Sequence, residues 1–541
     1  MTATSTVPPA PPSQPPAAAA PARPIPWLGL LAVLLGTFIS TLTGRLSSFG
    51  LADIRGGVHA GFDGGAWITT AQTVAQMLVT PFAIWTGTFY GARRVLMIAA
   101  TSFAVVSLLE PLSPNLGTLL IFQFLGGLGT GCFIPLTLSF ILRNMPPRAW
   151  AWGIALYALN LELSLNISAS LEGYYVDIIS WHWIFWQNVP LALGMAACLH
   201  FGVPRETRSA SMPPMDAYGL LSCGLGLALI YAALDQGNRV DWLNSGLIWG
   251  LLLAGLLLLV GFVVHEARTA HPWVDLKLVI SQPLPRLLVL IGFLRLTILS
   301  TSYLIPQFLG PVRGFRAIEV GQTLVWIAGP QLLFCPFAGF LLRRIDPRLV
   351  SSIGFICISV ACLMVARGIT NLWGSDQFLP SQLLQSIGQS FALSGIVFFA
   401  VLHLRPEAAI TFGAALQTAR LMGGEIGLAF VTTFLRVRSQ RASNLIGLHV
   451  TRGDHQVIMR IQDYAAFTRR ALDPAAATSR GTVVLGSVVR SAAATQGIID
   501  SFTMLAGLTA LALMLLVANR PAPIGPASHM PLFASRRPPT P

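Results

Sequence analysis

Apolar runs of about 20 residues recur along the chain, and short polar segments between them carry most of the charge. A helix of about 20 apolar residues crosses a hydrocarbon core of about 30 Å, so each run predicts a transmembrane helix. The pattern predicts fourteen spans. They cover residues 27–48, 66–87, 94–112, 117–141, 150–172, 183–203, 217–234, 246–265, 286–309, 318–342, 350–367, 378–402, 409–435 and 496–518.

The spans divide the chain into three membrane parts between two tails. A six-helix half is predicted at 27–203, a two-helix insertion with its loops at 204–285, and a second six-helix half at 286–518. Residues 1–26 and 519–541 are rich in Pro and small or polar residues, and we expect disordered tails there. The second half includes a long loop, 436–495, in which residues 455–471 have a mixed amphipathic pattern that predicts some helix.

Composition supports the same class of protein. The sequence is 54% hydrophobic and only 10% charged, with a mean hydropathy of +0.68. Soluble domains carry about 25% charged residues, so most of this chain does not face water. An all-α polytopic membrane protein in the lipid bilayer is therefore predicted.

The net charge of +13 reflects single arginines between apolar runs, which favours membrane topology over nucleic-acid binding. The loops after even-numbered spans carry the larger share of basic residues. They hold Arg93 and Arg94, Arg143 and Arg148, Arg205 and Arg208, Arg268 and Lys277, and Arg343, Arg344 and Arg348. Because cytoplasmic loops are enriched in Lys and Arg, both termini are predicted to be cytoplasmic and loop 436–495 external.

Enzymatic and metal chemistry find little support. Lys277 is the only lysine and no GxxxxGK precedes it, so a Walker A loop is absent. The glycine-rich run 126–131 lies within a span, where it predicts close helix packing. The six cysteines lie in apolar runs without a CxxC pair. We expect no catalytic residues, no metal site and no cofactor.

An internal repeat relates the two halves. Pro81-Phe82-Ala83 is followed twelve residues after its proline by Arg93, and Pro336-Phe337-Ala338 is followed at the same spacing by Arg348. Valine comes two residues later in both copies, at Val95 and Val350. Two related halves are typical of transporters.

Further motifs extend through residues 27–518. They are Gly65-Ala66-Trp67-Ile68, Ile134-Pro135-Leu136, Asn144-Met145-Pro146-Pro147, Gly173-Tyr174, Trp183-Ile184-Phe185, Asn188-Val189-Pro190, Asp216-Ala217-Tyr218-Gly219-Leu220, Leu234-Asp235-Gln236-Gly237, Asp241-Trp242, Val274-Asp275-Leu276, Leu304-Ile305-Pro306-Gln307 and Arg420 with Gly423-Gly424 and Ile426-Gly427. With them the chain resembles the fourteen-helix drug:proton antiporters of the major facilitator superfamily (EmrB/QacA type). The resemblance implies two six-helix halves with two inserted helices.

The chain departs from that family at its coupling motifs. The resemblance places an acid in the first span, where Thr43 stands with Arg45 two residues later. It places Arg and Gln in the fourth span, where this chain has Gln123 and Gly126. It places Gly-Pro in the fifth span, where this chain has Ser-Ala at residues 168–169. The cytoplasmic gating loop of the family is partly kept. Gly91, Arg93 and Arg94 are present, with Thr88 where an acid is common.

Three glutamates within the spans are candidates for proton coupling or substrate binding. Glu162 lies near the middle of the fifth span, Glu172 nearer its outer end, and Glu425 in the thirteenth. An ionised acid at the centre of a membrane helix costs roughly 2.5–3.5 kcal/mol, so such acids mark functional sites by default. The alternative for each is a carboxyl hydrogen-bonded to neighbouring helices without a role in transport.

Three arginines and one glutamine complete the candidate cavity and charge-pair set. Arg295 and Arg420 lie well inside their spans, and Arg45 lies near an outer end from which it is expected to snorkel to the interface. Gln123 stands at the family's arginine position in the fourth span. If Arg295 and Arg420 face a cavity, the substrates include anions or amphipathic acids as well as lipophilic cations.

The predicted function is secondary active efflux of amphipathic drugs across a bacterial inner membrane, coupled to protons, by alternating access. The resemblance implies a periplasmic adaptor and an outer-membrane channel as partners, with loop 436–495 as the docking surface. Two alternatives stay open. One is a specific metabolite or organic-acid transporter with coupling rebuilt on Glu162 or Glu425, and the other is a transport-inactive membrane partner or sensor.

Overall fold

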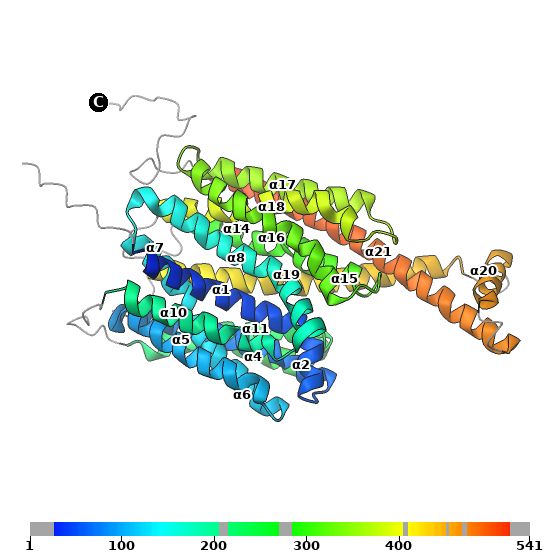
Figure 1. The fold of residues 1–541 in the computed structure, drawn as a ribbon, viewed down its shortest axis with the longest axis horizontal. Helices are drawn as coiled ribbons and strands as arrows, with labels where there is room; N and C mark the ends of the chain where they lie inside the picture. The colour runs from blue at the N-terminus through cyan, green and yellow to red at the C-terminus, as the bar shows by residue number, and fades with distance from the viewer. Residues whose placement is uncertain are drawn as a thin grey trace, which may run out of the picture.

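The computed structural model describes residues 26–204, 215–269, 284–403, 409–450, 454–467 and 473–519. These residues form helices, with no strand among them, so the predicted all-α class is confirmed. Figure 1 shows a bundle of long helices from which a helical hairpin ending in α20 projects. Both predicted tails, apart from Pro26 and Asn519, lie outside the described residues.

The first six predicted spans form one group of helices. They are α1 (Trp27–Phe49), α2 (Leu51–Gly57), α3 (Phe62–Gly65), α4 (Trp67–Tyr90), α5 (Ala92–Leu109), η1 (Glu110–Leu112), α6 (Leu116–Gly131), α7 (Phe133–Asn144), η2 (Pro147–Ala149), α8 (Trp150–Tyr174), η3 (Tyr175–Ile179), α9 (Trp183–Trp186) and α10 (Asn188–Gly202). Two of the spans are interrupted at prolines. Proline has no backbone N–H, so Pro135 cannot donate a hydrogen bond to the carbonyl oxygen of Gly131, where α6 ends. In the same way, Pro190 cannot donate to the carbonyl oxygen of Trp186, where α9 ends.

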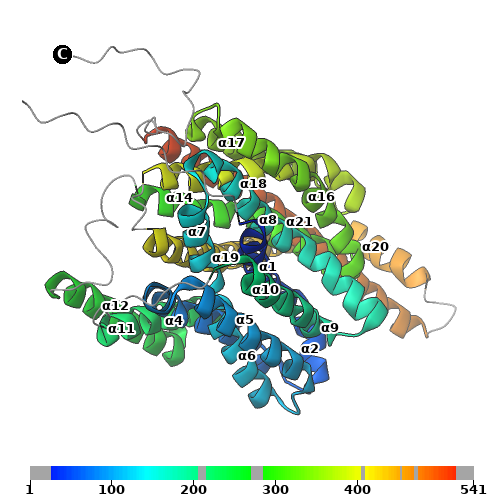
Figure 2. The ribbon, with the colours of Figure 1, turned by 60° about the vertical axis from the view of Figure 1, so that its left-hand side comes forward.

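The predicted insertion forms a helix pair at the edge of the bundle. It consists of α11 (Ala217–Gly237), η4 (Trp242–Asn244) and α12 (Gly246–Arg268). Figure 2 shows the pair beside α4, and α11 makes the contact with α4 and α19. The outer helix α12 exposes Leu256, Leu257 and Val260, as a helix against lipid does. Arg205, Arg208, Lys277 and the motif at 274–276 lie outside the described residues.

The second half repeats the membrane-helix pattern and then extends beyond it. Its elements are α14 (Leu284–Thr297), η5 (Ser300–Leu304), α15 (Ile305–Leu309), α16 (Ala317–Leu342), α17 (Pro347–Gly368), α18 (Ser375–Leu402), α19 (Ala409–Gly447), α20 (His455–Ala466) and α21 (Pro474–Val517). All fourteen predicted spans thus coincide with helices. Among the described residues, 12 helical segments are long and apolar enough to cross a membrane, and the more polar α4 and α19 fall outside that set.

The internal repeat has a structural counterpart at the end of the bundle opposite α20. Arg93 donates to the carbonyl oxygens of Leu199 (3.2 Å) and His200 (3.0 Å) near the end of α10. Arg348 donates to the carbonyl oxygen of Asn519 (2.7 Å) just after α21. In each half, therefore, the repeated arginine binds the C-terminal carbonyls of the last helix, where a cation is favoured.

Small residues bring the two halves into close contact. α8 packs along α16, and a Cβ atom added at Gly173 would lie 2.5 Å from the Ile318 backbone nitrogen. Gly321 approaches Ser170 in the same way, and the Ser170 hydroxyl donates to the Gly321 carbonyl oxygen at 2.8 Å. Close backbone approach through small residues is how membrane helices associate.

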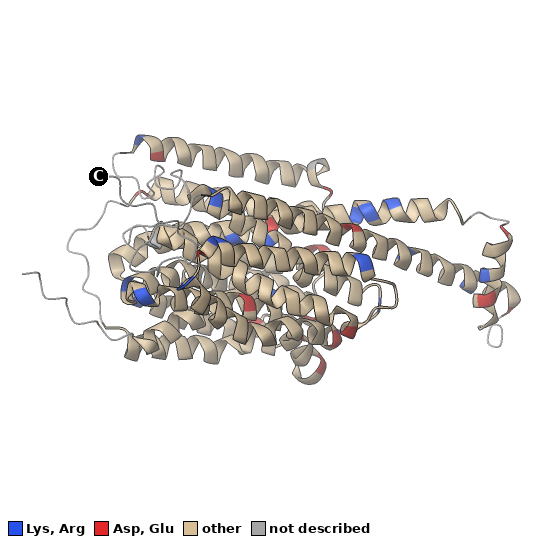
Figure 3. Ribbon diagram, turned by 90° about the horizontal axis from the view of Figure 1, so that it is seen from above, with Lys and Arg blue, Asp and Glu red and all other residues tan. Residues whose placement is uncertain are grey.

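Loop 436–495 is more helical than its sequence pattern indicated. α19 continues to Gly447 and α21 begins at Pro474, with α20 between them, so this stretch forms the projecting helical hairpin in Figure 1. Arg438 on α19 donates to Asp500 on α21 at 2.6 Å and ties the two helices together. Figure 3 shows charged residues along the hairpin and at the bundle ends, with fewer in between.

We predict that Gly173→Ala destabilises the protein by about 1–3 kcal/mol, the usual cost of overpacking, because the added methyl group meets backbone that cannot rotate away. The matched control is Gly194→Ala in α10, where an added Cβ would have no atom within 4 Å. We expect the control to be neutral or slightly stabilising. Thermal melting of the purified protein measures both, and equal melting temperatures would contradict the prediction.

Candidate functional site

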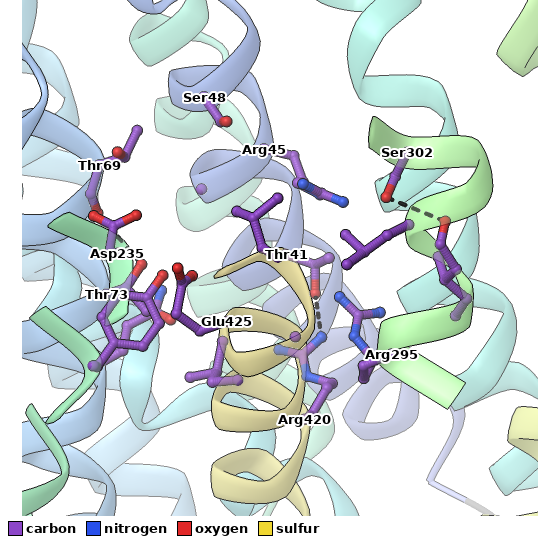
Figure 4. A pocket seen from close by; sticks show the side chains of 18 of the residues that line it. Thr41, Arg45, Ser48, Thr69, Thr73, Asp235, Arg295, Ser302, Arg420 and Glu425 are labelled. Carbon is purple, nitrogen blue, oxygen red and sulfur yellow. Dashed lines mark hydrogen bonds between the residues drawn. The ribbon is translucent and has the colours of Figure 1, made fainter. Parts of the chain in front are cut away.

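A cavity of about 160 Å³ lies between the two halves and the inserted pair, lined by α1, α4, α11, α14 with η5, and α19. It lies toward the hairpin end, because Ser48 is close to the C-terminal end of α1 and Thr69 is in the first turn of α4. Five charged side chains line it, and Figure 4 shows them together. They are Arg45, Asp235, Arg295, Arg420 and Glu425.

Arg420 links the halves within this cavity. It is 4% exposed, and its Nη1 donates to Thr41 Oγ1 on α1 at 3.0 Å. Its Nε and Nη2 both donate to Gln417 Oε1, one turn earlier on α19. Neutral oxygens therefore hold the guanidinium in place, and no ion pair involves it among the described residues.

Arg45 and Arg295 supply two further positive charges. The structure places Arg45 in the cavity lining, in agreement with its place in the candidate cavity set and not at the interface expected of a snorkelling side chain. The cavity provides the polar surroundings that a snorkelling side chain would otherwise seek. Arg295 Nε and Nη1 are buried and have no hydrogen-bond partner among the described residues.

Glu162 lies outside the lining but interacts with its charges. The side chain is completely buried on α8, and neither carboxyl oxygen has a hydrogen-bond partner in the described part of the chain. Its strongest electrostatic partner is Arg295, followed by Arg420 and Arg45. Glu162 is therefore the acid next to the arginine group, although no direct hydrogen bond joins them.

The second acid, Glu425, faces a different environment. It is 6% exposed on α19 and interacts with the Tyr231 hydroxyl and the charge of Asp235, both on α11. Asp235 in turn accepts hydrogen bonds from Thr70 on α4 and from Gln236 Nε2 (3.1 Å). Glu425 thus pairs with the inserted helix, and Arg420 on its own helix bonds elsewhere.

Sequence reasoning missed Asp235 and Tyr231. The predicted span ended at residue 234, whereas α11 continues to Gly237 and carries Asp235 within the helix. The bonds from Thr70 and Gln236 satisfy the carboxylate and allow the helix to continue. An acid directly after an apolar run was the available signal.

Three candidate positions lie away from the cavity. Gln123 on α6 is fully buried, and neither of its amide atoms has a hydrogen-bond partner among the described residues. Glu172 is 3% exposed near Gly50, and the charges of Asp53 and Asp177 act on it. The gating-loop residues lie at the opposite end of the bundle, where Gly91 has a φ of 85° that favours glycine and Arg94 is exposed.

A buried amide network next to Glu162 also joins the halves. Asn166 Nδ2 donates to Gln389 Oε1 on α18 (3.0 Å) and to Gln331 Oε1 on α16 (3.3 Å). Gln389 Nε2 continues to Thr301 Oγ1 in η5 at 3.2 Å. The spacing of Gln382, Gln385 and Gln389 on one helical face could have indicated it. No group of three or more His, Cys, Asp or Glu side chains able to hold a metal occurs in the described ranges.

We predict that Glu162 and Arg295 are energetically coupled. Glu162→Gln and Arg295→Gln should each lower the free energy of unfolding. The loss in the double variant should be smaller than the sum of the two single losses by about 0.5–3 kcal/mol. Arg286→Gln, an exposed arginine on the same helix α14, is the control and should be additive with Glu162→Gln. Melting curves of the single and double variants provide the test, and additivity with Arg295→Gln would refute the coupling.

The chain is similar in sequence and fold to known proteins. The family model "Major Facilitator Superfamily" matches residues 33–428. The chain is 30% identical over 356 residues to the probable multidrug resistance protein EmrY of Escherichia coli (66% of this chain, 68% of that one) and 23% identical over 429 residues to the fatty acid resistance protein FarB of Neisseria gonorrhoeae (78% and 83%).

A solved structure of a POT family transporter shares the fold, with a TM-score of 0.55 at 16% identity, covering 90% of this chain and 95% of that one. With its membrane-length helices, the protein is a multi-pass membrane protein. The match to the family model covers well over half of the sequence. The chain therefore belongs to the Major Facilitator Superfamily, a family of membrane transporters.

Proposed function

We propose that the protein exports amphipathic drugs or related organic compounds across a bacterial inner membrane, driven by the proton gradient. The observation that carries this proposal is the convergence of Arg45, Asp235, Arg295, Arg420 and Glu425 on one cavity between the halves. Charged groups are costly inside a membrane bundle and mark substrate and proton pathways. Relatives that include a protein named for multidrug resistance support a drug-like substrate.

The places where the halves touch support alternating access as the mechanism. In this structure α8 and α16 close tightly at Gly173 and Gly321, while α7 and α19 approach at Gly413 near the opposite end. Small-residue contacts of this kind bury little side-chain surface and can part and re-form as the halves rock about the cavity. The cavity itself lies toward the hairpin end, where exported substrate would leave.

Proton coupling is assigned to the two acids near the cavity. A proton carrier needs a carboxyl group that is reachable from each side in turn and whose charge affects substrate binding. The charge of the Glu162 carboxylate is compensated by the nearby guanidinium groups, but no direct hydrogen bond holds it to them. The carboxylate can therefore take up a proton in place of this compensation. Glu425 is the second candidate, with the Tyr231 hydroxyl beside it as a hydrogen-bond donor and Asp235 as a neighbouring acid. Glu172, beside Asp53 and Asp177 at the hairpin end, is a candidate exit group.

A specific observation favours organic acids as a second substrate class. Three arginines line the cavity, and Arg295 has donors that are free of protein partners in the described structure. Guanidinium groups bind carboxylates with paired hydrogen bonds. The relative named for fatty acid resistance is consistent with amphipathic acids among the substrates.

Topology and partners complete the proposal. Both termini are assigned to the cytoplasm and the helical hairpin to the periplasm, with residues 27–203, 204–285 and 286–518 as the three membrane parts. α19 has 39 residues and α21 has 44, and at about 1.5 Å per residue both are roughly twice as long as a hydrocarbon core of about 30 Å. The hairpin can therefore project beyond the membrane and offer a docking surface to a periplasmic adaptor, with an outer-membrane channel as the further proposed partner.

Reconstitution tests transport and coupling together. In proteoliposomes with an imposed pH gradient, we expect wild type to move ethidium and protons in opposite directions. Either Glu162→Gln or Glu425→Gln should abolish the proton flux. Glu110→Gln, a buried acid at the end of α5 outside the cavity lining, should leave it intact. Absence of any flux in wild type would overturn the transport proposal, and flux that survives both substitutions would overturn the assignment of the acids.

Shortening the hairpin tests its role. Replacing α20 and its flanking segments with a short Gly-Ser linker between α19 and α21 should abolish drug resistance in cells, because an adaptor would lose its docking surface. The same variant should keep ethidium transport in proteoliposomes, because the cavity lies elsewhere. Resistance equal to wild type in cells would contradict the docking role.

A further inference from the structure

The cavity separates its charges by sign. Figure 4 shows Asp235 and Glu425 on one side and Arg45 and Arg295 on the other. No ion pair joins the two sides among the described residues. Opposite charges that line one small cavity without pairing leave room for a ligand that pairs with both.

The acidic side is built by the inserted helix. Asp235 on α11 is oriented by Thr70 on α4 and by Gln236 Nε2. Glu425 on α19 is oriented by the Tyr231 hydroxyl, also from α11. Two carboxyl groups positioned by neutral hydrogen-bond donors form a preorganised site for a cationic group. α11 thus contributes directly to the cavity, in addition to packing against the bundle.

The basic side of the cavity has hydrogen-bond donors without an acceptor among the described residues. Arg295 Nε and Nη1 are buried there without a hydrogen-bond partner among the described residues. Leaving such groups unpaired costs about 1–3 kcal/mol each, and more when they are charged. An anionic group on a ligand would satisfy them.

The size of the cavity limits what it can hold. At about 160 Å³ it is smaller than the roughly 300–1,000 Å³ of sites that enclose a drug-sized ligand. It therefore fits the polar part of an amphiphile. Apolar contacts come from Ile298, Leu299, Leu421 and Leu428 in the same lining.

We propose that the cavity selects zwitterionic amphiphiles, with the cationic group at Asp235 and Glu425 and the anionic group of the same molecule at Arg295 and Arg45. This inference rests on the proposed export function and names the substrate class of that site. A ligand with one charge compensates one side and leaves the other desolvated and unpaired, whereas a zwitterion compensates both. The two-helix insertion then supplies half of the recognition.

A matched chemical series tests the proposal on the full-length protein in lipid nanodiscs at neutral pH. The probes are an aminomethyl-naphthoic acid, its methyl ester and its N-acetyl derivative, which share one aromatic body as zwitterion, cation and anion. Calorimetric titration should show the zwitterion binding at least about tenfold more tightly than either derivative. Equal affinity for the three probes, or no binding of any of them, would overturn the inference.

Single variants then assign the two sides. Asp235→Asn should weaken binding of the zwitterion and the ester about tenfold and leave binding of the N-acetyl derivative unchanged. Arg295→Gln should weaken binding of the zwitterion and the N-acetyl derivative about tenfold and leave binding of the ester unchanged. Asp216→Asn at the N-cap of α11 and Arg286→Gln on α14 remove the same charges away from the cavity and should not change binding of any probe. Glu425→Gln repeats the acid test if Asp235→Asn misfolds. Equal loss for all three probes in both Asp235→Asn and Arg295→Gln would refute the assignment.

The outcome is separable from that of the proposed function. Ethidium transport by wild type in proteoliposomes, together with equal binding of the three probes, leaves export standing and removes the zwitterion site. Preferential binding of the zwitterion without any transport keeps the site and removes the export function.

Discussion

The free-energy cost of charge inside the membrane bundle governs this structure. Each ionised side chain near the centre of a membrane helix costs roughly 2.5–3.5 kcal/mol on insertion scales, unless polar surroundings compensate it. The chain gathers five charged side chains around one cavity and places a sixth, Glu162, within their electrostatic reach. Gathered in this way, the charges share one polar environment, whereas separate positions would each have to be compensated alone.

Helix α19 is the element through which that compensation connects the molecule. It carries Arg420, which reaches Thr41 in the first half, and Glu425, which reaches the inserted helix. Its glycines permit the approach, because a Cβ added at Gly423 would lie 2.5 Å from the Cα atom of Gly292 on α14. A movement of α19 would therefore change the surroundings of both charges at once, as coupling between substrate and proton requires.

The helices and the types of charged residue within them could be predicted from the sequence, because the length of an apolar run and an isolated charge within it are local properties. The residues that line the cavity could not be predicted, because they depend on how each helix is rotated and packed. Gln123 and Arg45 were both candidates for the cavity set, but Gln123 is buried elsewhere, and only Arg45 lies in the cavity. The polar continuation of α19 and α21 includes the long-range pair Arg438–Asp500, which no local pattern shows.

The departures from the antiporter motifs fit a redistribution of charge. Thr43, at the position where the resemblance places an acid, donates to the Ile39 carbonyl oxygen (2.8 Å) and to Asn188 Oδ1 (3.2 Å), so that position is a neutral contact between α1 and α10. Ser168 likewise donates to its own helix, at the Leu165 carbonyl oxygen. Neither residue can exchange a proton near neutral pH.

The acids near the cavity, Glu162, Asp235 and Glu425, lie on α8, α11 and α19, and both halves contribute to that cavity. A coupling site of this kind would respond to the relative position of the halves, whereas an acid enclosed within the first half would respond less. Loss of the motifs is therefore compatible with the proposed transport, for which Glu162 and Glu425 are the proposed titratable carboxyl groups.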